Sequence, residues 1–159
     1  MRKILASLLL VFVAFTSAKA QFEQGTKYIG ASVSGLNLSY SANEHFRLGL
    51  NASAGMFVAD GLLIYANVGY DHQKHLDNVS AGLNGRYYFS QNGIFIGAGA
   101  EYDHFTKSNN DLMVPVEIGY CFYLNHYLSI EPAVYYKMST TAFSDNSTVG
   151  LRIGLGYFF

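Results

Sequence analysis

Residues 149–159 read VGLRIGLGYFF, and this stretch decides the fold. Apolar residues occupy every second position, namely Val149, Leu151, Ile153, Leu155, Tyr157 and Phe159. In a β-strand successive side chains point to opposite faces, so these residues share one face. Glycines, Arg152 and Phe158 are left on the other face. The strand therefore needs an apolar environment on one side and space for a charged side chain on the other.

The same period of two runs through most of the chain after residue 25, and it predicts eight strands. Their expected ranges are 26–39, 46–58, 62–72, 79–89, 94–105, 112–124, 127–138 and 147–159. The links after the second, fourth and sixth strands are short, whereas those after the third, fifth and seventh are longer and more polar. Short turns on one side and longer loops on the other are typical of transmembrane barrels. The strands run about 10–13 residues, which is enough for the roughly 9–11 that a tilted strand needs to cross a bilayer.

Charged residues test this assignment, because only apolar residues were used to make it. Every charge within predicted strands two to eight lies opposite the apolar face: Arg47, Asp71, Arg86, Glu101, Asp103, Glu117, Glu131, Lys137 and Arg152. The first strand fits less well, because positions 29–33 are out of phase with Leu36 and Leu38. A β-bulge near Ser34–Gly35 would restore the phase, and we expect one there.

The apolar face can point either inward, as in a soluble barrel, or outward to lipid. An eight-stranded barrel has too narrow an interior for Tyr and Phe from most strands. An arginine on the lipid face near the bilayer midplane costs about 2–4 kcal/mol, so the charges should face the lumen. Backbone groups left unpaired in hydrocarbon cost several kcal/mol each, so the sheet must close. We therefore predict an all-β, eight-stranded antiparallel up-and-down transmembrane β-barrel, with glycines and charges in a narrow lumen. A soluble ligand-binding barrel is the alternative.

The N-terminus has the pattern of a secretory signal peptide. MRK is basic, the apolar run ILASLLLVFVAF is short for a membrane anchor, and Ala18 and Ala20 form an A-x-A cleavage pattern. We expect residues 1–20 to be removed, which leaves residues 21–159 as the barrel domain. Removal of Arg2, Lys3 and Lys19 leaves seven basic residues against eleven acidic ones, and no basic patch points to nucleic acid.

The chain resembles the small eight-stranded outer-membrane barrels of Gram-negative bacteria, the OmpA/OmpX-like superfamily and the outer membrane protein beta-barrel domain group. The resemblance spans the chain after the signal and rests on AKA (18–20), YIGASVSG (28–35), AGMFVADGLLIYANVGY (54–70) and VGLRIGLGYFF (149–159). It implies an outer-membrane location and a C-terminal assembly signal, Tyr157 and Phe159, for the barrel-assembly machinery. We further expect a monomer in contact with outer-membrane lipid, periplasmic chaperones during biogenesis and an unidentified extracellular partner.

The lumen charges are the first candidate site. We interpret Arg47, Arg86, Glu101, Asp103, Glu117, Glu131, Lys137 and Arg152 as an ion-pair network that plugs the barrel, because buried charges need partners. The alternative is a gate or a narrow pore for ions or small solutes, lined by Glu101, Glu117 and Arg152.

The sequence offers little for catalysis or metal binding. Four histidines fall near the rim with the longer loops, His45, His72, His75 and His104, but their spacing matches no compact ligand motif. His126 and Ser129, in HYLS, lack a third group that would complete a triad. We therefore predict no catalytic residues, no metal and no cofactor, with a lipid-modifying enzyme as the alternative. Cys121 is the only cysteine, so no internal disulfide forms, and we expect it to be an inert packing residue.

Overall fold

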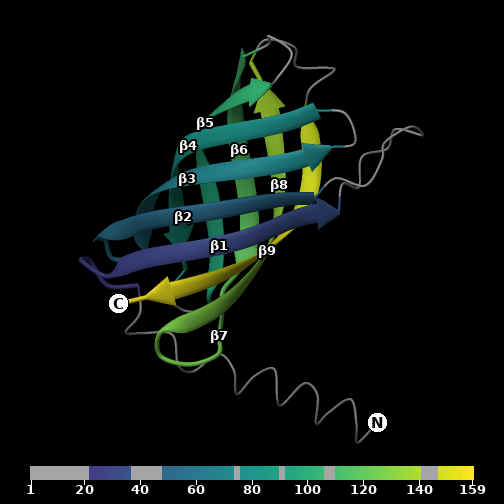
Figure 1. Ribbon diagram of the computed structural model, residues 1–159. Helices are drawn as coiled ribbons and strands as arrows, with labels where there is room; N and C mark the ends of the chain where they lie inside the picture. The colour runs from purple at the N-terminus through teal and green to yellow at the C-terminus, as the bar shows by residue number, and fades with distance from the viewer. Residues whose placement is uncertain (1–21, 37–47, 74–75, 90–91, 106–109, 141–146) are drawn as a thin grey trace, which may run out of the picture.

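The computed structural model describes residues 22–36, 48–73, 76–89, 92–105, 110–140 and 147–159. The predicted signal peptide and Arg47 lie outside these ranges. The described strands are β1 Lys27–Leu36, β2 Leu48–Ala59, β3 Leu62–Gln73, β4 Leu76–Tyr88, β5 Ile94–Phe105, β6 Asn110–Tyr120, β7 Phe122–Tyr123, β8 Leu128–Ser139 and β9 Thr148–Phe158 (Figure 1). Within the described ranges, no helix has the length and apolarity to cross a membrane.

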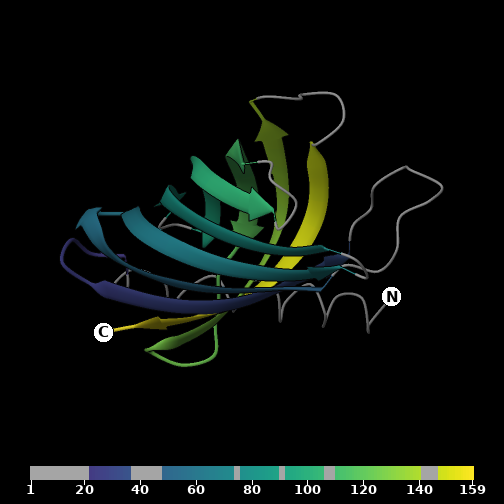
Figure 2. The ribbon, with the colours of Figure 1, turned by 45° about the horizontal axis from the view of Figure 1, so that its top comes forward.

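The strands form one closed antiparallel sheet. From β1 to β6 each strand pairs with the next one along the chain, β6 and β7 both pair with β8, and β8 pairs with β9. The pairing of β1 with β9 closes the ring (Figure 2). Segments β6 and β7 are one strand in effect, because Gly119 opposite Ala133 and Phe122 opposite Ile130 keep the same register on β8. Pro132 lies opposite the interruption and has no N–H to donate to the ladder. The predicted eight-stranded up-and-down barrel is therefore confirmed.

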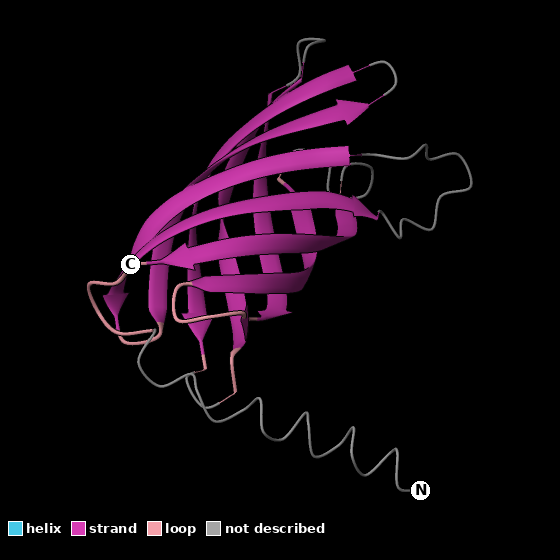
Figure 3. Cartoon of the chain, turned by 60° about the horizontal axis from the view of Figure 1, so that its bottom comes forward, coloured by secondary structure: helices cyan, strands magenta, loops and turns pink. Residues whose placement is uncertain are grey.

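The two ends of the barrel differ. The turns β2–β3, β4–β5 and β7–β8 lie at the end that also carries Lys27 and the C-terminus, and we call this the turn end (Figure 3). Gly61 and Gly93 have positive φ angles of 77° and 73° in two of these turns, a conformation that favours glycine. The opposite end, reached by the other four links, is called the loop end.

One predicted loop is largely strand. The polar composition of residues 73–78 predicts a loop, but β3 and β4 stay paired through Asp71 with Asn78, His72 with Asp77 and Gln73 with Leu76. Polar residues can continue a hairpin ladder in water, because the backbone makes the hydrogen bonds whatever the side chains are. The apolar pattern therefore underestimates the length of both strands.

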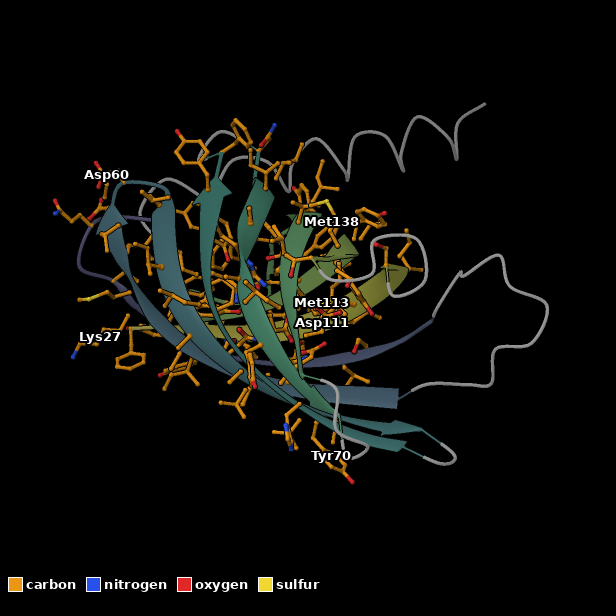
Figure 4. The ribbon with its side chains drawn as sticks, turned by 90° about the horizontal axis from the view of Figure 1, so that it is seen from above. Lys27, Asp60, Tyr70, Asp111, Met113 and Met138 are labelled. Atoms are coloured by element: carbon orange, nitrogen blue, oxygen red, sulfur yellow. The ribbon has the colours of Figure 1, made fainter. Side chains whose placement is uncertain are left out.

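The orientation of the two faces is as predicted. Ile153 and Leu155 are 59% and 50% exposed on the outer surface, whereas the side chain of Arg152, which directly precedes Ile153, is only 17% exposed. Figure 4 shows the same division at the labelled residues: Tyr70 and Lys27 project from the barrel, and the buried Asp111 and Met113 lie within its outline.

The expected irregularity in the first strand is also present. The register of β1 on β9 shifts between Ser34 and Leu36, which confirms the predicted bulge. Ile29 and Val33 are exposed on the outer face, as the phase before the bulge requires.

The interior differs from the prediction at the turn end. Glycines and charges were expected to fill the whole lumen, but here it is filled by a buried group that we call the aromatic cluster: Phe22, Tyr28, Phe57, Leu63, Tyr65, Tyr88, Phe95, Cys121, Ala133 and Phe158. Close packing of rings excludes water from one end of the bore. The polar part of the lumen therefore lies between the aromatic cluster and the loop end.

Candidate functional site: the ion-paired lumen

Arg86 joins two carboxylates in the part of the polar lumen that is nearest to the aromatic cluster. It projects inward from β4, and its Nε lies 2.5 Å from Glu117 Oε1 on β6 while its Nη1 lies 2.7 Å from Glu131 Oε2 on β8. The planar guanidinium presents several donors in a fixed geometry, so one arginine can hold two carboxylates across the bore. These pairs join strands that are not neighbours in the sheet.

Glu131 is surrounded by donors. Its carboxylate accepts hydrogen bonds from the Tyr28 hydroxyl at 3.0 Å, the Ser129 hydroxyl at 3.1 Å and the Tyr88 hydroxyl at 3.4 Å. A buried carboxylate needs such partners, because transfer of a charge out of water is otherwise very unfavourable. The aromatic cluster therefore supplies hydroxyl groups to the ion pair as well as apolar packing.

Glu117 links two arginines. In addition to Arg86, it forms an ion pair with Arg152 of β9, and it accepts a hydrogen bond from the Tyr65 hydroxyl at 3.1 Å. The Arg86 guanidinium also lies over the rings of Tyr65 and Phe95, at 4.8 and 4.6 Å from their centroids. We call the set Arg86, Glu117, Glu131 and Arg152 the central network. It rests directly on the aromatic cluster.

Inward-facing glycines leave room for this network. A Cβ on Gly97 would lie 2.8 Å from Glu117 Cγ, and one on Gly156 would lie 2.6 Å from Ser129 Oγ. Both distances are shorter than normal contacts. This agrees with the expectation that small residues line the lumen where long side chains cross it.

A second ionic group lies closer to the loop end. Lys137 Nζ is 2.8 Å from Glu101 Oε1, and the Ser139 hydroxyl donates to Asp111 Oδ2 at 2.5 Å. Asp111 faces Asp103 across the β5–β6 ladder, and both are buried. The apolar pattern places Asp111 in a loop, because Asp111 precedes Leu112, the first apolar residue of the predicted strand. The sequence analysis therefore did not identify Asp111 as a lumen residue.

Asparagines form a ladder on the opposite wall. Asn84 donates to Asn67 at 2.6 Å, and Asn67 donates to Asn51 at 3.4 Å, from β4 through β3 to β2. Beside this ladder and Arg152 lies a small polar cavity with room for about one water molecule. The asparagines lie at inward-facing positions of the predicted strands, and this shared parity is the sequence signal that could have identified them.

The predicted lumen residues divide into three groups. The structure brings Arg86, Glu117, Glu131 and Arg152 into one network, pairs Glu101 with Lys137, and places Asp103 near the loop end. Arg47 lies outside the described residues. The predicted assembly residues Tyr157 and Phe159 are exposed at the turn end with their ring centroids 5.7 Å apart.

The two residues considered for catalysis in the sequence, His126 and Ser129, differ in their surroundings. His126 lies on an exposed turn, whereas the Ser129 side chain is fully buried and hydrogen-bonded to Glu131. The described residues contain no group of three or more His, Cys, Asp or Glu side chains that could hold a metal ion. His45, His75 and the side chain of His72 lie outside the described residues.

Comparison with known proteins gives similarity in fold rather than in sequence. No protein-family model and no curated protein sequence matches the chain. The N-terminal β-barrel domain of Pseudomonas aeruginosa OprF matches with a TM-score of 0.69 and 16% identity, over 86% of this chain and 98% of that one. Neisserial surface protein A matches with a TM-score of 0.65 and 17% identity, over 86% and 100% of the two chains.

The Yersinia pestis outer membrane protein Ail, in a phospholipid bilayer nanodisc, matches with a TM-score of 0.58 and 10% identity, over 86% of this chain and 100% of that one. Identities this low establish the fold alone. That fold is the one found in small eight-stranded outer-membrane barrels.

Proposed function

We propose that this chain is a monomeric, non-enzymatic integral protein of the outer membrane whose lumen is plugged and whose loop end contacts an extracellular partner. The observation that carries the proposal is a closed barrel with apolar side chains outside and ion pairs inside. It would reach the membrane after removal of residues 1–20, with the help of periplasmic chaperones and the barrel-assembly machinery.

The outer surface supports a lipid environment. Large apolar side chains are exposed on strands all round the ring, among them Leu50, Val68, Leu83, Ile118 and Ile153. Soluble monomers rarely expose continuous apolar patches of more than a few hundred Å², because such surfaces associate in water. Acyl chains would cover this surface without any partner protein.

The turn end supports a position at the membrane–water interface. Aromatic side chains are exposed there on several strands: Tyr87, Phe89, Phe122, Tyr127, Tyr157 and Phe159. Such rings are enriched where the apolar body meets lipid and the polar edge meets water. Both termini of the barrel lie at this end, so it would face the periplasm, and the loop end would face outward.

The lumen contents support a plug rather than a channel. The central network lies on the aromatic cluster, and the cavity beside Arg152 has room for about one water molecule. Conduction would require the ion pairs to separate and leave charges without partners, which is costly in a narrow bore. A narrow pore for ions or small solutes is therefore the less favoured function.

Four measurements test the proposal: gel migration, cell fractionation, conductance in planar bilayers and the mass of lipid A. Purified protein in detergent should migrate differently on a gel before and after boiling, as folded barrels do, and it should be recovered from cells with the outer membrane. In planar bilayers it should show no steady conductance. Recovery only in the soluble periplasmic fraction would contradict the membrane assignment, and steady conductance that changes with Arg152→Ala would favour the pore. Expression that altered the mass of lipid A would favour a lipid-modifying enzyme.

A further inference from the structure

The segment Phe22–Thr26 folds back across the turn end of the barrel. The Gly61 N–H donates to the Phe22 carbonyl at 2.7 Å, and the Gly25 N–H donates to the Phe57 carbonyl at 2.9 Å. The Gln24 N–H donates to Asp60 Oδ1 at 2.9 Å. Gly25 has a φ of 92°, which allows the chain to reverse before β1 begins. The segment is therefore fixed to the β2–β3 turn rather than left free in solvent.

The Phe22 ring lies in a pocket of other rings. It stacks on Tyr88 at 4.5 Å between centroids and contacts Tyr123 at 5.7 Å, Phe57 at 5.9 Å and Phe158 at 6.3 Å. These four rings, which we call the aromatic seat, come from β4, β7, β2 and β9. Strands from different sides of the barrel thus contact the single side chain of Phe22, which is 3% exposed.

We propose that Phe22–Thr26 is a stopper, and that the aromatic seat is a binding site for one aromatic ring that the chain's own Phe22 fills. The stopper closes the turn end and keeps water from the aromatic cluster and from Glu131 behind it. The sidedness of this closure, facing the periplasm, rests on the proposed function. The seat itself does not, because it is formed within the barrel whatever membrane surrounds it.

A filled seat stabilises the buried ion pair, because the aromatic seat lies directly against the central network. Tyr88 contacts Phe22 through its ring and donates its hydroxyl to Glu131 at 3.4 Å. Water that entered the seat would raise the local dielectric around this ion pair and compete for its donors. A ring in the seat keeps the carboxylate in a dry site with its donors in place.

The chain contains its own reporter for closure of this end. Cys121 is the only cysteine, is 4% exposed and belongs to the aromatic cluster. Its Sγ lies 3.8 Å from Glu131 Oε1, on the lumen side of the wall. A thiol reagent in water must therefore enter the bore to reach it, and modification needs local opening.

The experiment measures the rate at which N-ethylmaleimide modifies Cys121 in folded protein in detergent micelles. Phe22→Ala should be modified at least about tenfold faster than wild type, because the seat is then empty and the end is open. Phe22→Leu should stay close to wild type, because it still fills most of the seat. Saturating toluene should restore protection to Phe22→Ala and leave wild type unchanged.

Three controls make the result specific. Phe122→Ala removes an exposed ring at the same end and should not change the rate. Cys121→Ser should show no modification. Gel migration before boiling should show that every variant is folded, and Phe22→Val replaces Phe22→Ala if that variant is not. The stopper would be overturned if Phe22→Ala, or Phe22→Val in its place, were modified at the wild-type rate. It would also be overturned if Phe122→Ala raised the rate as much as the substitution of Phe22. Faster modification without rescue by toluene would overturn the aromatic binding site.

Discussion

Arg86 of β4 and Glu131 of β8 are joined across the bore, with 2.7 Å between Nη1 and Oε2, and both side chains are almost completely buried. Neither strand is a neighbour of the other in the sheet. The ion pair therefore connects two strands through the lumen, and not along the wall of the barrel. Glu117 pairs with both Arg86 and Arg152, so β9 is connected to the same network.

The first prediction concerns the removal of Arg86. Arg86→Leu should lower the free energy of unfolding by about 3–5 kcal/mol, because Glu117 and Glu131 would remain buried without their shared cation. Urea unfolding in lipid vesicles measures the change. The double variant Arg86→Leu/Glu131→Leu should be more stable than the single one, since it leaves fewer unpaired charges. If the two substitutions instead add independently, the pair is not coupled.

The second prediction uses two glycines that face the lumen. A Cβ at Gly97 would lie 2.8 Å from Glu117 Cγ, whereas the nearest atom to a Cβ at Gly154 is 3.5 Å away. Gly97→Ala should therefore destabilise the barrel by about 1–3 kcal/mol, because Glu117 would have to move from its partners. Gly154→Ala should be close to neutral. Unfolding midpoints of the two variants, measured side by side, test the difference, and equal midpoints would show that Glu117 can shift freely.

The third prediction tests the outer face. Ile153 is exposed in the middle part of β9, so Ile153→Arg should cost about 2–4 kcal/mol in a bilayer. Tyr127→Arg, at the turn end, should cost about 0–1 kcal/mol because an interfacial side chain can reach water. The comparison is made by refolding both variants into vesicles of one lipid. A neutral effect of Ile153→Arg would mean that this surface does not face hydrocarbon.

The strands and their faces are predictable because one simple rule applies at every position of a strand that has one apolar face and one polar face. The side-chain period is two, and a charge on the wrong face is costly, so the sequence alone assigns Arg152 and Ile153 to opposite sides of the wall. The bulge near Ser34 follows from the same rule. The β3–β4 ladder beyond Asp71 does not follow this rule, because polar residues stand there at consecutive positions and leave no alternating pattern to read.

The partners within the lumen are not predictable from the pattern. Arg86 could have paired with any inward carboxylate at its level, and the choice of Glu117 and Glu131 depends on how far the strands are staggered around the ring. The aromatic cluster does leave a signal. Adjacent aromatic residues such as Tyr87–Tyr88 and Phe158–Phe159 place one ring outside and one inside, so both faces are apolar near the turns.

The fourth prediction separates assembly from stability at the C-terminus. Phe159 is exposed beside Tyr157, and its backbone N–H and carbonyl pair with Lys27 at 3.0 and 2.8 Å, where the ring of strands closes. Phe159→Ala keeps these backbone hydrogen bonds and removes only an outward ring. If Tyr157 and Phe159 are the assembly signal, the variant should reach the outer membrane at a several-fold lower level and yet refold in vesicles with a stability near that of wild type.

Phe89→Ala removes another exposed ring at the turn end and serves as the matched control, with an expected normal level in cells. Equal losses of Phe159→Ala and Phe89→Ala in cells would assign the ring to interfacial anchoring, and a matching loss of stability in vesicles would assign it to packing.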